Sequence, residues 1–225
     1  MKFANYQQDD PTRPEHTTWT PAPGSKSDDI GYTRDVLDAV EAAFCIDTNR
    51  IFATGKSQGG GFVGQLACDP AMSTRIAAYA PVSGAYYIAG VETCDPATVE
   101  VPCNASRTDI PILAFHGGAD GTIPYHGKTD PCLPDIPSWV RQWVVREGLK
   151  ETPIKTPIDK SKNGEIRSYG DGLVTFVYDG DDIDHDWPAT TTNSDNAREG
   201  HVKAAFNAST WIMEFFRKNT LPSQK

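Results

Sequence analysis

Residues 50–68 have the sequence RIFATGKSQGGGFVGQLAC, and this stretch decides the fold. The β-prone residues 50–54 are followed at once by a glycine-rich corner, Gly55-Lys56-Ser57-Gln58-Gly59, and then by apolar residues at helical spacing. The corner fits Gly-x-Ser-x-Gly, in which the serine occupies a sharp, strained strand-to-helix turn. Side chains at either flanking position are expected to collide with the neighbouring strand and helix. Strand, turn and helix together predict Ser57 as an exposed nucleophile, and the alternative is a glycine-rich turn with an incidental serine.

The rest of the chain continues to alternate strand and helix patterns. Residues 1–27 show no apolar period and are expected to form an extended lead-in, and residues 28–225 are expected to form one domain. We expect a helix from an N-cap at Asp28 or Ser27 to about Cys45, helices at 139–146 and 202–217, strands at 76–82 and 111–115, and strands at 165–169 and 173–178 that pair across the turn at 170–172. This order predicts an α/β fold with a mostly parallel sheet.

A serine hydroxyl becomes a good nucleophile only when a base accepts its proton and a carboxylate orients that base. The acid and then the histidine should follow the serine, each in a loop at the end of a strand. Asp120 lies just past the strand at 111–115, and His185 lies in the loop after the strand at 173–178. The sequence therefore predicts a triad of Ser57, Asp120 and His185.

Other assignments for these positions stay open. Asp120 could instead cap the turn before Gly121. His116 stands at a strand end ahead of the acid and is expected to be buried and hydrogen-bonded to the backbone, while His126 and His201 compete with His185 as the base.

The acidic run at 181–186 lacks the central glycine and terminal glutamate of a calcium loop, so a solvated acidic loop is the better interpretation. Trp187 follows this run and either lines an acyl pocket or packs behind the histidine loop. No Cys-x-x-Cys motif or Cys/His cluster indicates a metal site.

Charge and cysteine content indicate which classes of binding partner are not expected and in which compartment the protein folds. A formal net charge of −9 argues against a generic attraction to nucleic acid or to an anionic membrane surface. Apolar runs fall short of the roughly 18 residues that a membrane span needs. Five cysteines and two glycosylation sequons, at Asn104 and Asn207, indicate an oxidising, secretory environment and leave one cysteine unpaired. Residues 1–5 lack the features of a signal peptide, so a secreted protein would here be trimmed, re-engineered or mispredicted.

Five blocks of this chain, at 28–32, 50–62, 76–84, 116–125 and 185–188, resemble a known family. They are similar to the secreted feruloyl esterases and related polyhydroxybutyrate-depolymerase-like esterases of carbohydrate esterase family 1, especially the fungal members. The resemblance implies an α/β-hydrolase catalytic domain over 28–225 that needs no cofactor. It also implies that an acyl-enzyme on Ser57 releases ferulic or p-coumaric acid from arabinose on plant cell-wall xylan.

Within that resemblance other activities stay open: an acetyl xylan esterase, a polyester depolymerase, or an inert homologue that only binds polysaccharide or a partner chain. Tyr125 and Trp187 are the candidate substrate-pocket residues. The oligomeric state is left open.

The resemblance also implies a departure. Family members begin with further strands and a loop whose N–H supplies half of the oxyanion hole, and we expect this chain to be truncated at its N-terminus, leaving a sheet edge exposed. The other half of the hole would be the N–H of Gln58. Cys94 and Cys103 are near enough in sequence to close a short disulfide loop.

Overall fold

A six-stranded sheet forms the centre of the computed structural model, which describes residues 22, 25 and 27–221. The expected lead-in at 1–27 lies almost wholly outside the described residues. The strands, in chain order, are β1 (Phe52–Lys56), β2 (Ala78–Val82), β3 (Ile112–His116), β4 (Ile154–Pro157), β5 (Glu165–Tyr169) and β6 (Val174–Tyr178). Their order in the sheet is β1-β2-β3-β6-β5-β4. The first four run parallel, and β5 and β4 join as antiparallel neighbours, which confirms the mostly parallel sheet.

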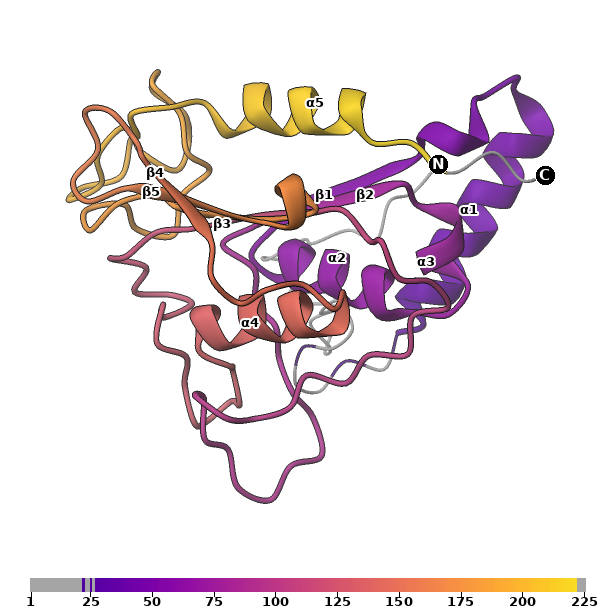
Figure 1. Ribbon diagram of the computed structural model, residues 1–225, viewed down its shortest axis with the longest axis horizontal. Helices are drawn as coiled ribbons and strands as arrows, with labels where there is room; N and C mark the ends of the chain where they lie inside the picture. Colours follow the sequence, from indigo (N-terminus) through magenta and orange to yellow (C-terminus); the bar gives the residue numbers. More distant parts are fainter. Residues whose placement is uncertain (1–21, 23–24, 26, 222–225) are drawn as a thin grey trace, which may run out of the picture.

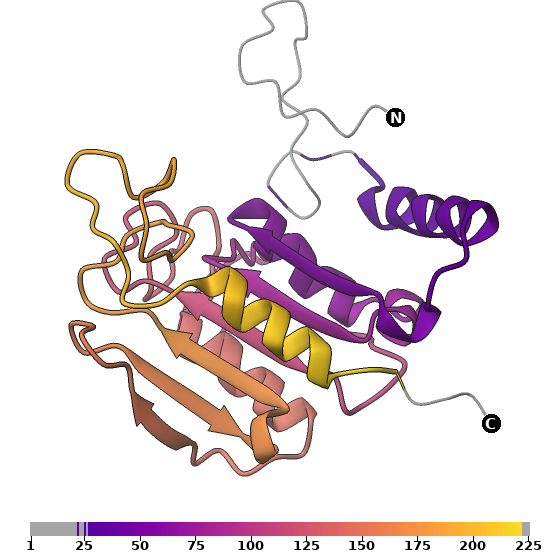
Figure 2. The same cartoon turned by 90° about the horizontal axis from the view of Figure 1, so that it is seen from above.

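Helices cover both faces of the sheet. They are α1 (Asp29–Ala43), α2 (Gln58–Cys68), the short α3 (Met72–Arg75), α4 (Ile136–Arg146) and α5 (Ala208–Lys218). Helix α5 lies on one face, and α2 and α4 lie on the other (Figure 1). Figure 2 looks onto the sheet from the α5 side and shows α1 standing away from it. The described part of the chain therefore has a layered α/β architecture with a mostly parallel sheet.

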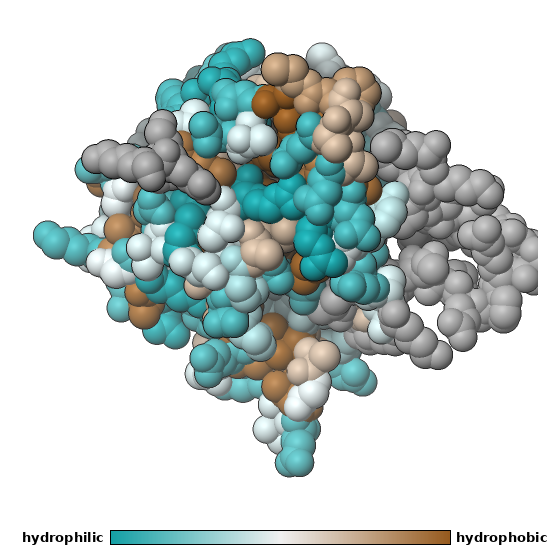
Figure 3. Space-filling model, turned by 90° about the vertical axis from the view of Figure 1, so that its right-hand side faces the viewer, coloured by the Kyte–Doolittle hydropathy of each residue, from teal (hydrophilic) through white to brown (hydrophobic). Residues whose placement is uncertain are grey.

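Two apolar cores fill the spaces between these layers, because successive side chains of a strand point to opposite faces. On β3, Ile112 belongs to the core beneath α2 and α4, whereas Leu113 and Phe115 belong to the core beneath α5. Trp139 and Trp143 of α4 are almost fully buried in the first core. Figure 3 views the molecule from the α1 end and shows apolar surface broken into separate patches among hydrophilic residues.

Sequence signals placed most of the element boundaries correctly. Asp28 is the N-cap of α1, and its Oδ1 accepts a hydrogen bond from the Gly31 N–H at 2.8 Å, as the sequence predicted. The hairpin turn at 170–172 also forms, with Tyr169 opposite Val174.

The last helix begins at Ala208, so the prediction of helix from 202 was wrong for its first six residues. The N–H groups of Ala204 and Ala208 donate to the carbonyls of Ala189 and Pro188, which holds this segment as an irregular loop. Phe206 reaches the core from that loop and stacks on Trp211 at 4.2 Å between ring centroids. The apolar spacing that predicted a helix at this position reflects the packing of a loop residue in the core.

Two disulfides join the loop after β2 to the end of α2 and to the loop after β3, and they differ from the expected pairing. Cys68 bonds Cys103, and Cys94 bonds Cys132, so the Cys94–Cys103 prediction was wrong. Nearness in sequence was its basis, but the chain brings Cys103 to the end of α2, where the Asn104 N–H donates to the Cys68 carbonyl at 3.0 Å.

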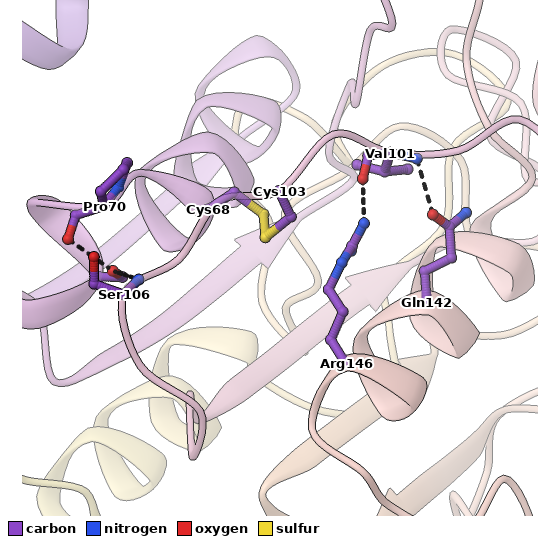
Figure 4. Close-up of a disulfide and its surroundings, with 8 residues drawn as sticks. Cys68, Pro70, Val101, Cys103, Ser106, Gln142 and Arg146 are labelled. Atoms are coloured by element: carbon purple, nitrogen blue, oxygen red, sulfur yellow. Dashed lines mark hydrogen bonds between the residues drawn. A yellow bond between two sulfur atoms is a disulfide. The ribbon is translucent and has the colours of Figure 1, made fainter.

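The segment around Cys103 is also held from α4. Arg146 donates to the Val101 carbonyl, and the Gln142 side chain accepts from the Val101 N–H at 2.8 Å (Figure 4). Cys45 is free and exposed, which agrees with the expected unpaired cysteine.

Strand β1, which leads to Ser57, is an outer strand among the described residues, where it pairs with β2 alone. None of the described helices is long and apolar enough to cross a membrane.

Candidate active site

Ser57 occupies a tight turn between the end of β1 and the start of α2. Its backbone has φ 60° and ψ −123°, which is strained for any residue but glycine. Its N–H donates to the Val82 carbonyl at 3.1 Å, and its carbonyl accepts from the Ala85 N–H at 2.8 Å. The loop after β2 therefore holds the turn in place.

The flanking glycines differ in what they make room for. A Cβ on Gly55 would lie 2.7 Å from the main chain of Gly59, so the expected collision is real there. A Cβ on Gly59 would meet nothing within 4 Å, so the expected collision was wrong for this glycine. The close approach falls instead on Gly61, where a Cβ would lie 1.9 Å from the Ala85 carbonyl oxygen. These glycines allow α2 to pack closely against β2 and the loop that follows it.

Asp120 and His185 form a buried pair in the loops after β3 and β6. The Nδ1 of His185 lies 2.8 Å from Oδ2 of Asp120. The other carboxylate oxygen, Oδ1, accepts the N–H groups of Thr122 at 3.0 Å and Ile123 at 2.7 Å. Asp120 therefore caps the turn and also contacts the imidazole, so its capping hydrogen bonds leave one oxygen for His185.

The backbone of the histidine loop is fixed on both sides of His185. Oδ1 of Asp184 accepts the N–H groups of His185 at 2.6 Å and Gly121 at 3.0 Å, which joins this loop to that of Asp120. Burial alone would raise the pKa of Asp184, but these two hydrogen bonds and the nearby His201 and His185 rings together outweigh it, and the pKa lies below its ordinary value. On the other side, Nη2 of Arg198 donates to the His185 carbonyl at 2.9 Å.

The imidazole that binds Asp120 leaves its Nε2 as an acceptor, which is the arrangement a general base needs. Ser57 and the Asp120–His185 pair share one edge of the sheet, because β1, β3 and β6 run parallel and end there. In the described part of the chain no hydrogen bond joins the Ser57 hydroxyl to the imidazole. Such contacts are often loose before a substrate binds.

The other histidines have their main hydrogen-bond partners elsewhere, although Nε2 of His116 also lies 3.3 Å from Oδ2 of Asp120. His116 is buried, and its Nε2 lies 2.8 Å from the Ile123 carbonyl oxygen, which confirms the expectation of a backbone-bonded histidine. Its burial lowers the pKa, so the ring stays neutral. His126 is exposed beside Asp135, and His201 bonds Asp186 at 2.8 Å. No hydrogen bond joins either of them to Asp120 in this structure.

The predicted oxyanion and pocket residues, Gln58, Tyr125 and Trp187, belong to the segments that directly follow β1, β3 and β6. Gln58 is the first residue of α2, where the helix itself offers its N–H no partner. The Tyr125 hydroxyl lies 3.4 Å from Arg167, and the Trp187 Nε1–H donates to the Ser209 hydroxyl at 3.0 Å while the ring packs on the core beneath α5. Asn104 is exposed, whereas Oδ1 of Asn207 accepts from the Thr190 N–H at 2.9 Å.

Sequence reasoning missed a buried acid close to Asp120. Asp179 is fully buried at the end of β6, and neither carboxylate oxygen has a hydrogen-bond partner among the described residues. Burial raises its pKa well above the ordinary value, and the charges of Asp120 and Asp186 add to the effect. Only its place directly after a strand could have signalled it. The described residues include no group of three or more His, Cys, Asp or Glu side chains that could hold a metal ion.

Comparison with known proteins returns esterases. The chain is 28% identical over 181 residues to a protein named "Probable feruloyl esterase C" of Aspergillus clavatus, covering 75% of this chain and 58% of that protein. It is 33% identical over 149 residues to the protein of the same name of Aspergillus terreus, covering 64% and 46%. Feruloyl esterase D of Neurospora crassa is 33% identical over 96 residues, covering 43% and 28%.

The chain thus spans about half the length of several curated relatives that it matches. A solved structure titled "Crystal Structure of a Thermostable Esterase" overlaps 86% of this chain and 37% of its own, with a TM-score of 0.44 and 16% identity. No family model matches the chain. In sequence the chain is therefore similar to feruloyl esterases.

Proposed function

We propose that this chain is a carboxylic-ester hydrolase that acts through an acyl-enzyme on Ser57. The observation that carries the proposal is the buried 2.8 Å contact between His185 and Asp120, at the sheet edge where the strained Ser57 turn also lies. A serine, an acid and a histidine, in that chain order, are the parts that acyl transfer needs.

In the proposed reaction His185 Nε2 takes the proton of the Ser57 hydroxyl as the oxygen attacks the ester carbonyl. Asp120 holds the imidazole in the tautomer with the proton on Nδ1 and stabilises the imidazolium that forms. The N–H of Gln58, at the positive end of α2, would stabilise the oxyanion. His185 then protonates the leaving alcohol, and water attacks the acyl-enzyme by the same route in reverse.

We further propose that the substrate is a feruloyl or p-coumaroyl ester on plant cell-wall arabinoxylan and that the protein is secreted. The names of its relatives support the acyl group. Two disulfides support an oxidising compartment, and the exposed Asn104 is the better placed of the two sequons for glycosylation.

A fluorophosphonate probe tests the nucleophile directly. We expect the wild-type protein to form one covalent adduct, and we expect Ser57→Ala to remain folded, to give no adduct and to lose hydrolysis of a soluble aryl ester. Mass spectrometry of the labelled peptide locates the adduct. A folded wild-type protein that forms no adduct would instead favour an inert homologue that binds polysaccharide or a partner.

The acyl specificity needs a second measurement. Release of ferulate, acetate and hydroxybutyrate is compared on matched esters at equal concentration. We expect ferulate to be released fastest. A chain that releases acetate or hydroxybutyrate but no ferulate would be an ester hydrolase of another specificity.

A further inference from the structure

The two halves of the proposed triad come from distant strands. Ser57 follows β1, and His185 follows β6, which is three strand positions away in the sheet. At about 4.8 Å per strand, the histidine loop must reach back across roughly 14 Å to meet the serine. Something has to fix that loop over the turn that carries Ser57.

One carboxylate oxygen, on Asp195, connects the end of β1 with the histidine loop. Oδ2 of Asp195 accepts a hydrogen bond from Nζ of Lys56 at 2.6 Å and another from the Trp187 N–H at 2.9 Å. Lys56 is the last residue of β1, directly before Ser57, and Trp187 stands two residues after His185. The bridge therefore connects the residue next to the nucleophile with the loop of the base.

The charges of this bridge are partly shielded from water. The side chains of Lys56 and Asp195 are 22% and 21% exposed, so solvent screens them less than an open surface pair. Burial alone would raise the pKa of Asp195, but the hydrogen bonds from Lys56 and the Trp187 N–H, with the charges of Lys56 and Arg198, together outweigh it and hold the pKa below its ordinary value. Asp195 thus stays ionised and keeps both hydrogen bonds at neutral pH.

Asp195 is itself anchored to the backbone of the histidine loop. Its carbonyl accepts from Nε of Arg198 at 3.0 Å, and Nη2 of the same arginine donates to the His185 carbonyl at 2.9 Å. Its N–H donates to Oδ1 of Asn193 at 2.9 Å, and the Asn193 amide donates to the Trp187 carbonyl at 2.9 Å. A displacement of Asp195 would therefore move the backbone on both sides of His185.

We propose that Lys56 and Asp195 are positioning residues that hold the His185 loop in register with Ser57, an inference that rests on the proposed function. Neither side chain needs to touch the substrate. A lysine side chain is long enough to reach from the strand to the loop. Lys56, which occupies the variable position before the serine in Gly-x-Ser-x-Gly, therefore has a specific role in this chain.

The test compares Lys56→Met, Asp195→Asn and the double variant, and Lys56→Arg serves as the conservative replacement. Misplacing a catalytic group by about 1 Å can cost about 100-fold, so we expect kcat on a soluble aryl ester to fall about 10- to 100-fold, with KM changed less than about twofold. The rate of fluorophosphonate labelling should fall by the same factor. The kcat of the double variant should be no lower than that of the less active single variant, because both changes break the same bridge.

Lys155→Met is the matched control, because it breaks the exposed ion pair with Glu165 on the β4–β5 hairpin. It should leave kcat unchanged, and Lys56→Arg should restore most of the activity lost in Lys56→Met. Thermal unfolding of each variant separates a loss of folding from a loss of position.

Three outcomes would overturn the proposal: Lys56→Met and Asp195→Asn with wild-type kcat, losses that appear only in KM, or losses that multiply in the double variant. A wild-type protein that neither hydrolyses the ester nor takes up the probe overturns the proposed function, and this proposal with it. An active wild-type protein with unaffected variants overturns the positioning role alone.

Discussion

Asp120 divides its two carboxylate oxygens between two tasks. One oxygen caps the turn at Thr122 and Ile123, and the other binds His185. The order of motifs located this residue in the sequence, but the sharing of its oxygens depends on the folded path of both loops. Sequence reasoning could therefore propose Asp120 as the acid without showing which hydrogen bonds fix its carboxylate.

Asp120→Asn should separate the two tasks. The amide oxygen can still accept the turn N–H groups, so the protein should fold, but the amide no longer fixes the histidine tautomer. We expect kcat on an aryl ester to fall by about 1,000- to 10,000-fold with the fold retained. Asp159→Asn, at an exposed site, is the control for the chemical change itself. Near-normal turnover in Asp120→Asn would remove this residue from the proposed triad.

Asp179 gives a prediction on the pH dependence of stability. In the folded protein the pKa of Asp179 is raised well above the ordinary value of 3.8. At a pH between the unfolded and the folded pKa, the unfolded chain has therefore released a proton that the folded chain keeps. This group therefore lowers the free energy of unfolding as pH rises through that window. Asp179→Asn cannot ionise and should lose this slope.

Urea unfolding of wild type and Asp179→Asn at about pH 4.5 and about pH 8 measures the effect. The variant should gain stability relative to wild type on going to the higher pH. An unchanged difference between the two proteins would mean that Asp179 ionises normally in the fold.

Helix α2 shows how one element can be recognised from sequence while its packing is not. The strand, glycine corner and helical period together were enough to place β1, Ser57 and α2. Which glycine is sterically required depends on the loop after β2, which touches Gly61 and leaves space at Gly59. Contacts between segments far apart in sequence leave no mark in a local pattern.

Two substitutions on this helix test that difference. Gly61→Ala should destabilise the protein by at least about 2 kcal/mol, because its Cβ would overlap the Ala85 carbonyl. Gly59→Ala has open space and should gain up to about 1 kcal/mol from the helix preference of alanine. Equilibrium unfolding in urea compares them, and equal effects of the two changes would contradict the packing described for α2.

Periodicity was least informative where tertiary contacts decide the element. Phe206 has the spacing of the last helix but enters the core from a loop. Strand β4 is short and exposed along its whole length, so it carries no apolar alternation that could have predicted it. Both cases lie outside the parallel strands, whose buried runs gave clear signals.

At the scale of the whole molecule, the disulfides were the least predictable feature. Five cysteines allow many pairings, and the choice depends on where the loops after β2 and β3 fold back. The observed bonds span 35 and 38 residues.

Removing one of these bonds should cost stability through the unfolded state. A loop of this length is worth about 3–4 kcal/mol in the chain-entropy description, so the double change Cys68→Ser and Cys103→Ser should lower the free energy of unfolding by about that amount. Urea unfolding without reductant measures it, and Cys45→Ser, which removes only the free thiol, is the control. A loss no larger than that of the control would show that the bond contributes little.

The two disulfide rings overlap, because Cys94 lies inside the ring closed by Cys68 and Cys103, and Cys103 lies inside the other. A protease that cuts once anywhere between Cys68 and Cys132 therefore releases no fragment. Cleavage in the shared stretch between Cys94 and Cys103 leaves the halves joined twice. The loop that carries Asp120 lies within this protected span, so a nicked molecule would keep its acid covalently attached to the part that carries Ser57 until a reductant acts.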